Sequence, residues 1–124
     1  MHEIRDMEKN AARLAAERTR RTLARADVYR AIDSERDYQI AMAAKAHGDP
    51  SNDGKKKLEE FVLYMDAYMT TLKHELSTVW GPDAYAGPLQ TLRKVVALGV
   101  AAMEIHGAPP RISPTKHPKG TDIT

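Results

Sequence analysis

The segment from Leu92 to Gly107 most constrains what this chain can fold into, because nearly every residue in it is apolar. It reads L-R-K-V-V-A-L-G-V-A-A-M-E-I-H-G, and a Pro-Pro pair follows shortly after it. The pattern predicts a helix that is apolar on almost all sides, and such a helix must be buried among other helices. Its only charges before the last turn are Arg93 and Lys94. A half-buried cation needs an anionic partner, which is either a carboxylate of this chain or a phosphate brought by a ligand.

Composition limits the classes of protein to which the chain can belong. Its 124 residues predict one small domain. The absence of cysteine excludes disulfides, thiolate metal sites and a cysteine nucleophile. No apolar run approaches the ~20 residues of a membrane span, and no secretory signal follows Met1. We therefore expect a cytoplasmic protein with no membrane partner. The net charge of +2 is too small to argue for nucleic acid as a partner.

Helix formers and helix breakers divide the chain into three predicted helices, so the expected fold class is all-α. Residues 4–46 contain no Pro or Gly and are rich in Ala, Arg and Glu, which predicts one long helix or two joined by a kink. A loop is expected over residues 47–54. The second helix is expected over residues 56–79 and the third over residues 89–106, after turns at Gly81-Pro82 and Gly87-Pro88.

The predicted organisation has three parts. Residues 1–27 form an N-terminal helical arm with few large apolar residues, and residues 28–107 form the core of a helical bundle. Residues 108–124 hold four of the seven prolines and are expected to be a disordered tail. Three helices leave apolar surface of the second and third without cover. We therefore expect a homo-oligomer that completes the bundle.

Two polar residues of the first helix fall where helical spacing calls for apolar ones. Glu35 and Gln39 continue a stripe that begins at Val28, so both are expected to face inward. One interpretation is a buried polar network, in which Glu35 bonds to a cation of the third helix and Gln39 completes the network. The other interpretation makes Glu35 and Gln39 the polar wall of a ligand pocket.

Carboxylates of the first two helices raise the question of a metal site. Mg²⁺ prefers several carboxylate oxygens that converge from different helices. Glu35, Glu59 and Asp66 are the candidates, with Asp66 expected to face inward, but the third helix adds no acid before Glu104. The alternative is a solvated edge with intrahelical Glu–Lys pairs. The histidines do not cluster in the sequence, which argues against zinc.

Three segments resemble the MazG-like all-α nucleoside triphosphate pyrophosphohydrolases, particularly the short versions common in phages. Residues 31–39, A-I-D-S-E-R-D-Y-Q, look like the family's first-helix motif, an Ile followed by Glu-Arg and then Gln. Residues 58–68 resemble its acidic second helix, and residues 92–105 resemble its last, Ala/Val-rich helix. The resemblance covers residues 28–107 and implies a MazG-like helical bundle with a long N-terminal helix in front of it.

The chain departs from this family where the family binds metal. The resemblance implies a Glu-x2-Glu pair on one helix and a Glu-x2-Asp pair on a later one, but the acids of residues 58–68 have the wrong spacing, and Arg93 and Lys94 occupy the later helix. Cations there could hold phosphates without the metal that catalyses hydrolysis. We therefore expect no catalytic residue, metal or cofactor. The expected ligand-binding residues are Glu35, Arg36, Gln39, Asp66, Arg93 and Lys94.

A leading function and two alternatives follow from these observations. The leading function is non-catalytic binding of a nucleotide or a nucleotide-derived signal, which in a phage would suit an anti-defence sponge for an immune second messenger. The first alternative is a Mg²⁺-dependent nucleoside triphosphate pyrophosphohydrolase that uses Glu35, Glu59 and Asp66. The second is a structural or protein-binding helical module with its Arg-rich first helix as the contact. The expected partners are a nucleotide-type small molecule and further copies of the chain.

Overall fold

The structure is a computed structural model that describes residues 2–47 and 55–112. In these ranges the chain forms three α-helices and no strand: α1 (His2–His47), α2 (Leu58–Thr78) and α3 (Ala86–His106). The all-α prediction is therefore confirmed for this part of the chain. Disorder is expected for the tail, residues 108–124, and residues 113–124 of that tail lie outside the described ranges.

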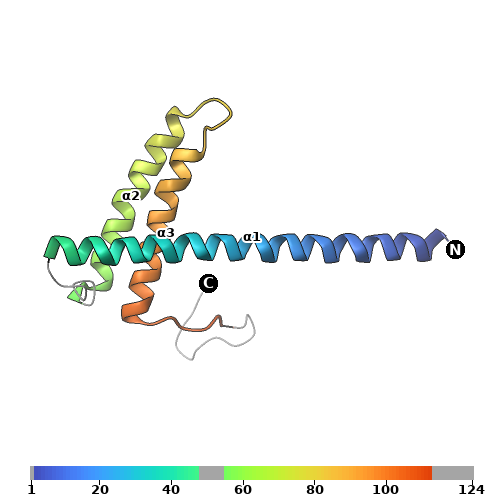
Figure 1. Cartoon of the computed structure of the whole chain (residues 1–124), viewed down its shortest axis with the longest axis horizontal. Coiled ribbons are helices and arrows are strands. Elements are labelled where there is room, and N and C mark those ends of the chain that lie inside the picture. Colours follow the sequence, from blue (N-terminus) through green and yellow to red (C-terminus); the bar gives the residue numbers. More distant parts are fainter. Residues whose placement is uncertain (1, 48–54, 113–124) are drawn as a thin grey trace, which may run out of the picture.

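The first helix is a single rod. α1 runs for 46 residues without interruption, so the single long helix is found rather than two helices joined by a kink. At a rise of about 1.5 Å per residue it is roughly 70 Å long. Its C-terminal part crosses the hairpin of α2 and α3, while its N-terminal part extends away from them (Figure 1). Every residue from His2 to Arg25 is exposed apart from the half-buried Glu17. We call residues 2–27 the arm.

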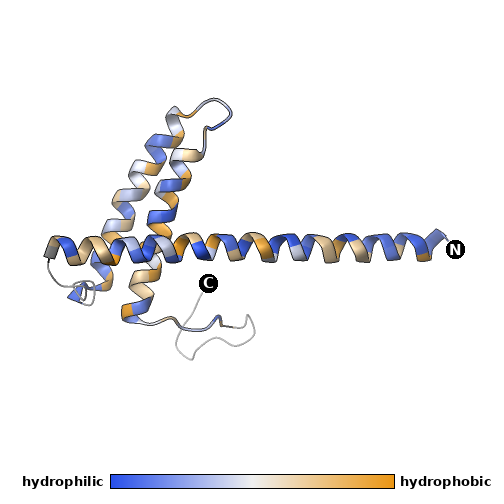
Figure 2. Cartoon of the chain, viewed as in Figure 1, coloured by the Kyte–Doolittle hydropathy of each residue, from blue (hydrophilic) through white to orange (hydrophobic). Residues whose placement is uncertain are grey.

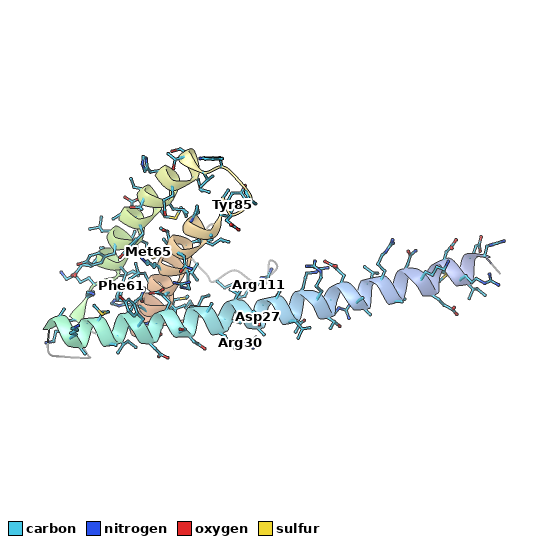
Figure 3. The ribbon with its side chains drawn as sticks, turned by 45° about the horizontal axis from the view of Figure 1, so that its top comes forward. Asp27, Arg30, Phe61, Met65, Tyr85 and Arg111 are labelled. Atoms are coloured by element: carbon cyan, nitrogen blue, oxygen red, sulfur yellow. The ribbon has the colours of Figure 1, made fainter. Side chains whose placement is uncertain are left out.

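The third helix joins the other two, because both pack against it. α2 pairs with α3 and α1 crosses α3, whereas no Cα atoms of α1 and α2 approach within 8 Å of each other. The centre of the core is Phe61 of α2, which is fully buried against Ala101 and Ala102 of α3. A Cβ added to Gly99 would lie 3.5 Å from the Met65 Cε atom, so the small residues of α3 let α2 approach closely. Phe61 and Met65 are labelled in Figure 3.

The turn predicted at Gly87-Pro88 is wrong, because these residues lie in the first turn of α3, which begins at Ala86. The first N–H groups of a helix have no intrahelical partner, so a proline without an N–H is tolerated there. The other end of α3 behaves as expected. Gly107 follows it with a φ of +118°, a conformation that favours glycine, and its N–H donates to the Met103 carbonyl at 2.9 Å.

The prediction that the third helix is buried on nearly all sides is wrong for the single chain. Val95, Ala97 and Ala101 are buried, but Leu89 and Met103 are exposed. The physical reason is that α1 and α2 cover only part of its circumference. Figure 2 shows hydrophobic and hydrophilic residues interspersed along both helices of the hairpin. In the part of the chain that the structure describes, no helix has the apolar length that a membrane span requires.

Candidate functional site

The polar residues singled out on the first and third helices meet where α1 crosses α3. Ile32 is the first buried residue of α1, and Glu35 and Arg36 follow it at three and four residues, on the same helix face. All three are buried. The expectation that Glu35 faces inward is confirmed, and Gln39 is half-buried one turn further on.

Glu35 forms an ion pair with Arg93 across the two helices. The Arg93 Nε atom donates to the Glu35 Oε1 atom at 2.9 Å. The Glu35 side chain is 6% exposed and the Arg93 side chain is 33% exposed. The anionic partner of Arg93 is thus a carboxylate of this chain, as the polar-network interpretation has it. Among the described residues, the two Nη nitrogens of Arg93 have no acceptor, and they remain able to donate.

A second ion pair, which the sequence analysis did not anticipate, joins Arg36 to Glu104 near the end of α3. The Arg36 Nε and Nη2 atoms donate to the two carboxylate oxygens of Glu104 at 3.1 and 2.9 Å. The Nη1 atom donates to Gln39 Oε1 at 3.2 Å, and the Gln39 amide lies 3.5 Å from the Lys94 carbonyl. Two parallel hydrogen bonds are the strongest form of an arginine–carboxylate pair. Arg36 and Gln39 therefore have structural partners within the fold.

Lys94 is placed differently from Arg93. Its Nζ atom lies 6.0 Å from the centre of the Tyr68 ring, within the range of a cation–π interaction. In the part of the chain that the structure describes, its ammonium forms no ion pair with a carboxylate. Its positive charge is therefore not neutralised by a neighbouring acid.

An open cavity of about 580 Å³ lies beside these two cations, between α1 and α3. Its lining residues are Ala31, Ser34, Glu35, Tyr38, Gln90, Arg93 and Lys94. Two cations thus face one carboxylate, with a hydroxyl from Ser34, a phenol from Tyr38 and an amide from Gln90 nearby. The last three residues are not among the expected ligand-binding residues, because an exposed polar side chain on a helix carries no signal of its own.

A second cavity of about 410 Å³ adjoins the first and extends to α2. The two cavities share Glu35, Tyr38 and Lys94. The second is also lined by Tyr64 and Tyr68. The joint space therefore has a cationic end between α1 and α3 and an aromatic end beside α2.

The candidate metal ligands of α2 do not join this site. Asp66 and Glu59 are exposed, and Asp66 lines neither cavity, so the expectation that Asp66 faces inward is wrong. Asp66 directly follows Met65, which faces α3, and successive residues of a helix are turned by about 100°. Within the ranges 2–47 and 55–112, no three His, Asp or Glu side chains are placed to hold a metal ion. Glu35, Glu59 and Asp66 therefore do not form a Mg²⁺ site in this arrangement.

Comparisons of the chain with protein-family models, with curated proteins and with solved structures found no match. What the site does is therefore inferred from its own residues.

Proposed function

We propose that the chain binds an anionic ligand of the nucleotide type between α1 and α3 and does not turn it over. The observation that carries this proposal is the cavity in which Arg93 and Lys94 face a single carboxylate, Glu35. The net positive charge suits phosphate oxygens, and so do the Nη donors of Arg93, which have no acceptor among the described residues, because phosphate oxygens accept charge-assisted hydrogen bonds. A volume of about 580 Å³ lies within the range of small-molecule sites, which is about 300–1,000 Å³.

The aromatic end of the joint cavity favours a nucleotide over a bare phosphate. Tyr38 belongs to both cavities, and Tyr64 and Tyr68 line the second. An aromatic base has a flat face that stacks on such rings, while its phosphates remain near the two cations. A ligand with both features uses the whole of the joint space.

A MazG-like bundle completed by further copies of the chain is part of the proposal. The exposed apolar residues of α3, with an apolar groove of about 350 Å³ between Val28 of α1 and Leu89, Leu92 and Val96 of α3, support it. Such surfaces on a single chain mark sites of association. In a phage, a non-catalytic binder of this kind would act as a sponge for a nucleotide signal.

A titration of the intact protein with nucleotides tests the proposal, and Lys94 is the residue to change. Lys94→Met removes a cation that forms no ion pair within residues 2–47 and 55–112, so the fold should survive. Lys73→Met is the control, because Lys73 is exposed on α2 and lines none of these cavities. A charge-assisted hydrogen bond contributes about 1.5–3 kcal/mol, so Lys94→Met should weaken binding about tenfold or more. The control should bind like the parent protein.

Three results would overturn the proposal. One is the absence of binding for every nucleoside mono-, di- and triphosphate tried at millimolar concentration. Another is an affinity that Lys94→Met leaves unchanged. The third is Mg²⁺-dependent release of pyrophosphate that Glu35→Gln abolishes, since this would show the pyrophosphohydrolase instead.

A further inference from the structure

The arm carries an apolar stripe that no described element covers. Ile4, Met7, Ala11 and Leu14 follow one another at intervals of three and four residues, so they lie on one face of α1. Ile4, Met7 and Leu14 are 58%, 70% and 62% exposed. The side chains in Figure 3 extend from the arm with α2 and α3 far from most of its length. This spacing is that of the a and d positions of a coiled coil.

The same stripe continues as a row of arginines. Arg18, Arg21 and Arg25 follow Leu14 at the same intervals of three and four residues, before the stripe reaches the core at Ile32. The opposite end of the arm is richer in acid, because residues 2–8 contain three acids, Glu3, Asp6 and Glu8, against one arginine, Arg5. The arm is thus apolar at its centre and N-terminal end, acidic around that end, and basic toward the core.

An arm of this kind gains stability from a partner helix. Most helical stability in proteins comes from packing an apolar face, and the face of the arm that carries Ile4, Met7 and Leu14 packs against no described element. The distribution of charge along the arm limits the direction in which a second arm can pair with it. In a parallel, in-register pair of arms, each arginine of the stripe would face its own copy, and three layers of like charge would repel. In an antiparallel pair, the basic segment of each arm lies beside the acidic end of the other.

We propose that two copies of the chain associate through their arms as an antiparallel helical pair. Ala11 of one copy lies opposite Leu14 of the other, Met7 opposite Arg18, and Ile4 opposite Arg21. Arginine stems are apolar and cover Ile and Met, while their guanidinium groups reach the acids that flank the stripe. This pairing is independent of what the cavity between α1 and α3 binds.

Single cysteines test both the interface and its direction, because the natural chain has none. In the antiparallel register the two copies of residue 14 are three residues apart along the axis, about 5 Å, whereas the two copies of residue 7 are eleven apart, about 16 Å. Leu14→Cys should therefore form a covalent dimer with bismaleimidoethane, and Met7→Cys should form several-fold less. Both positions are exposed, so neither variant disturbs the core. Equal cross-linking of the two variants would show a parallel pair, and cross-linking of neither would remove the arm as the interface.

A charge reversal on the stripe tests whether its arginines pair with the acidic end of the other arm. Arg18→Glu with Arg21→Glu places acids against the acidic end of the other arm, and should raise the dimer dissociation constant at least tenfold in sedimentation equilibrium. Arg13→Glu with Arg20→Glu makes the same change of net charge on the opposite face of the helix, and should change that constant less than threefold. Equal weakening by the two double variants would overturn the proposal, as would a parent protein that stays monomeric at high micromolar concentration.

Discussion

Removing Arg93 should destabilise the fold, because it leaves Glu35 as a buried carboxylate without its partner. Glu35 is 6% exposed and receives one hydrogen bond from Arg93, at 2.9 Å. Breaking a buried ion pair from one side costs about 3–5 kcal/mol. Arg93 itself is 33% exposed, so water already screens part of the interaction. We therefore expect Arg93→Met to lower the free energy of unfolding by about 2–3 kcal/mol, below the range for a fully buried pair.

A double-mutant cycle measures this effect. For a domain of this size, 1 kcal/mol shifts the melting temperature by about 4 °C, so Arg93→Met should melt about 10 °C below the parent protein. Glu35→Gln should cost less, because Arg93 can turn to water. The double variant has no stranded charge, so it should be more stable than the sum of the two single losses implies, with a coupling of about 1–2 kcal/mol.

Lys94→Met is the matched control, since it removes the neighbouring cation on the same helix without stranding a carboxylate. It should shift the melting temperature by less than about 3 °C, within the usual effect of a change away from the core. An equal loss of stability for Arg93→Met and Lys94→Met, or additive effects in the cycle, would refute the assignment of Glu35 to Arg93.

Three further substitutions test other contacts. Glu104→Gln weakens the bidentate pair in which the Arg36 side chain is 7% and the Glu104 side chain 47% exposed; because water screens the exposed carboxylate, urea unfolding should show a loss of about 1–2 kcal/mol, and no loss would mean that this pair does not hold α1 on α3. Gly99→Ala should stabilise the protein by about 0.5–1 kcal/mol in the same assay, because the added methyl would meet Met65 at an ordinary 3.5 Å; a lower free energy of unfolding would contradict that spacing. Phe61→Ala should cost about 3–5 kcal/mol or prevent folding, and a loss under about 1 kcal/mol would show that Phe61 is not at the centre of the core.

Local pattern was enough to predict the helices and the inward face of the first one. The absence of Pro and Gly from residues 4–46 leaves a long helix as the natural structure, and α1 is one helix. The three-residue step from Ile32 to Glu35 puts both side chains on one helix face, and both are buried. The same reasoning failed at Gly87-Pro88, because proline is as acceptable in the first turn of a helix as in a loop.

Pairing between distant segments could not be predicted from local pattern. Arg36 and Glu104 are 68 residues apart in the chain, and their contact depends on the angle at which α1 crosses α3. The burial of Asp66 was predicted wrongly for a related reason. The position of α3 decides which edge of α2 faces inward. The buried residues of α2 are Phe61 and Leu72, and they lie on a face that does not include Asp66.

The internal ion pair and the proposed ligand site are compatible, and the geometry of Arg93 shows why. Glu35 engages only the Nε atom, on one edge of the planar guanidinium. A planar group held at one edge has a restricted orientation, so its Nη donors stay directed toward a limited region of the cavity. A binding group held in this way loses less entropy when a ligand arrives than a mobile side chain does. Under the proposed function, Glu35 is therefore a positioning residue, Arg93 provides oriented hydrogen bonds, and Lys94 provides charge. The sequence left two interpretations of Glu35 open, a member of a buried polar network and part of the wall of a ligand pocket. Both hold together under the proposed function, because Glu35 binds Arg93 and also lines the cavity.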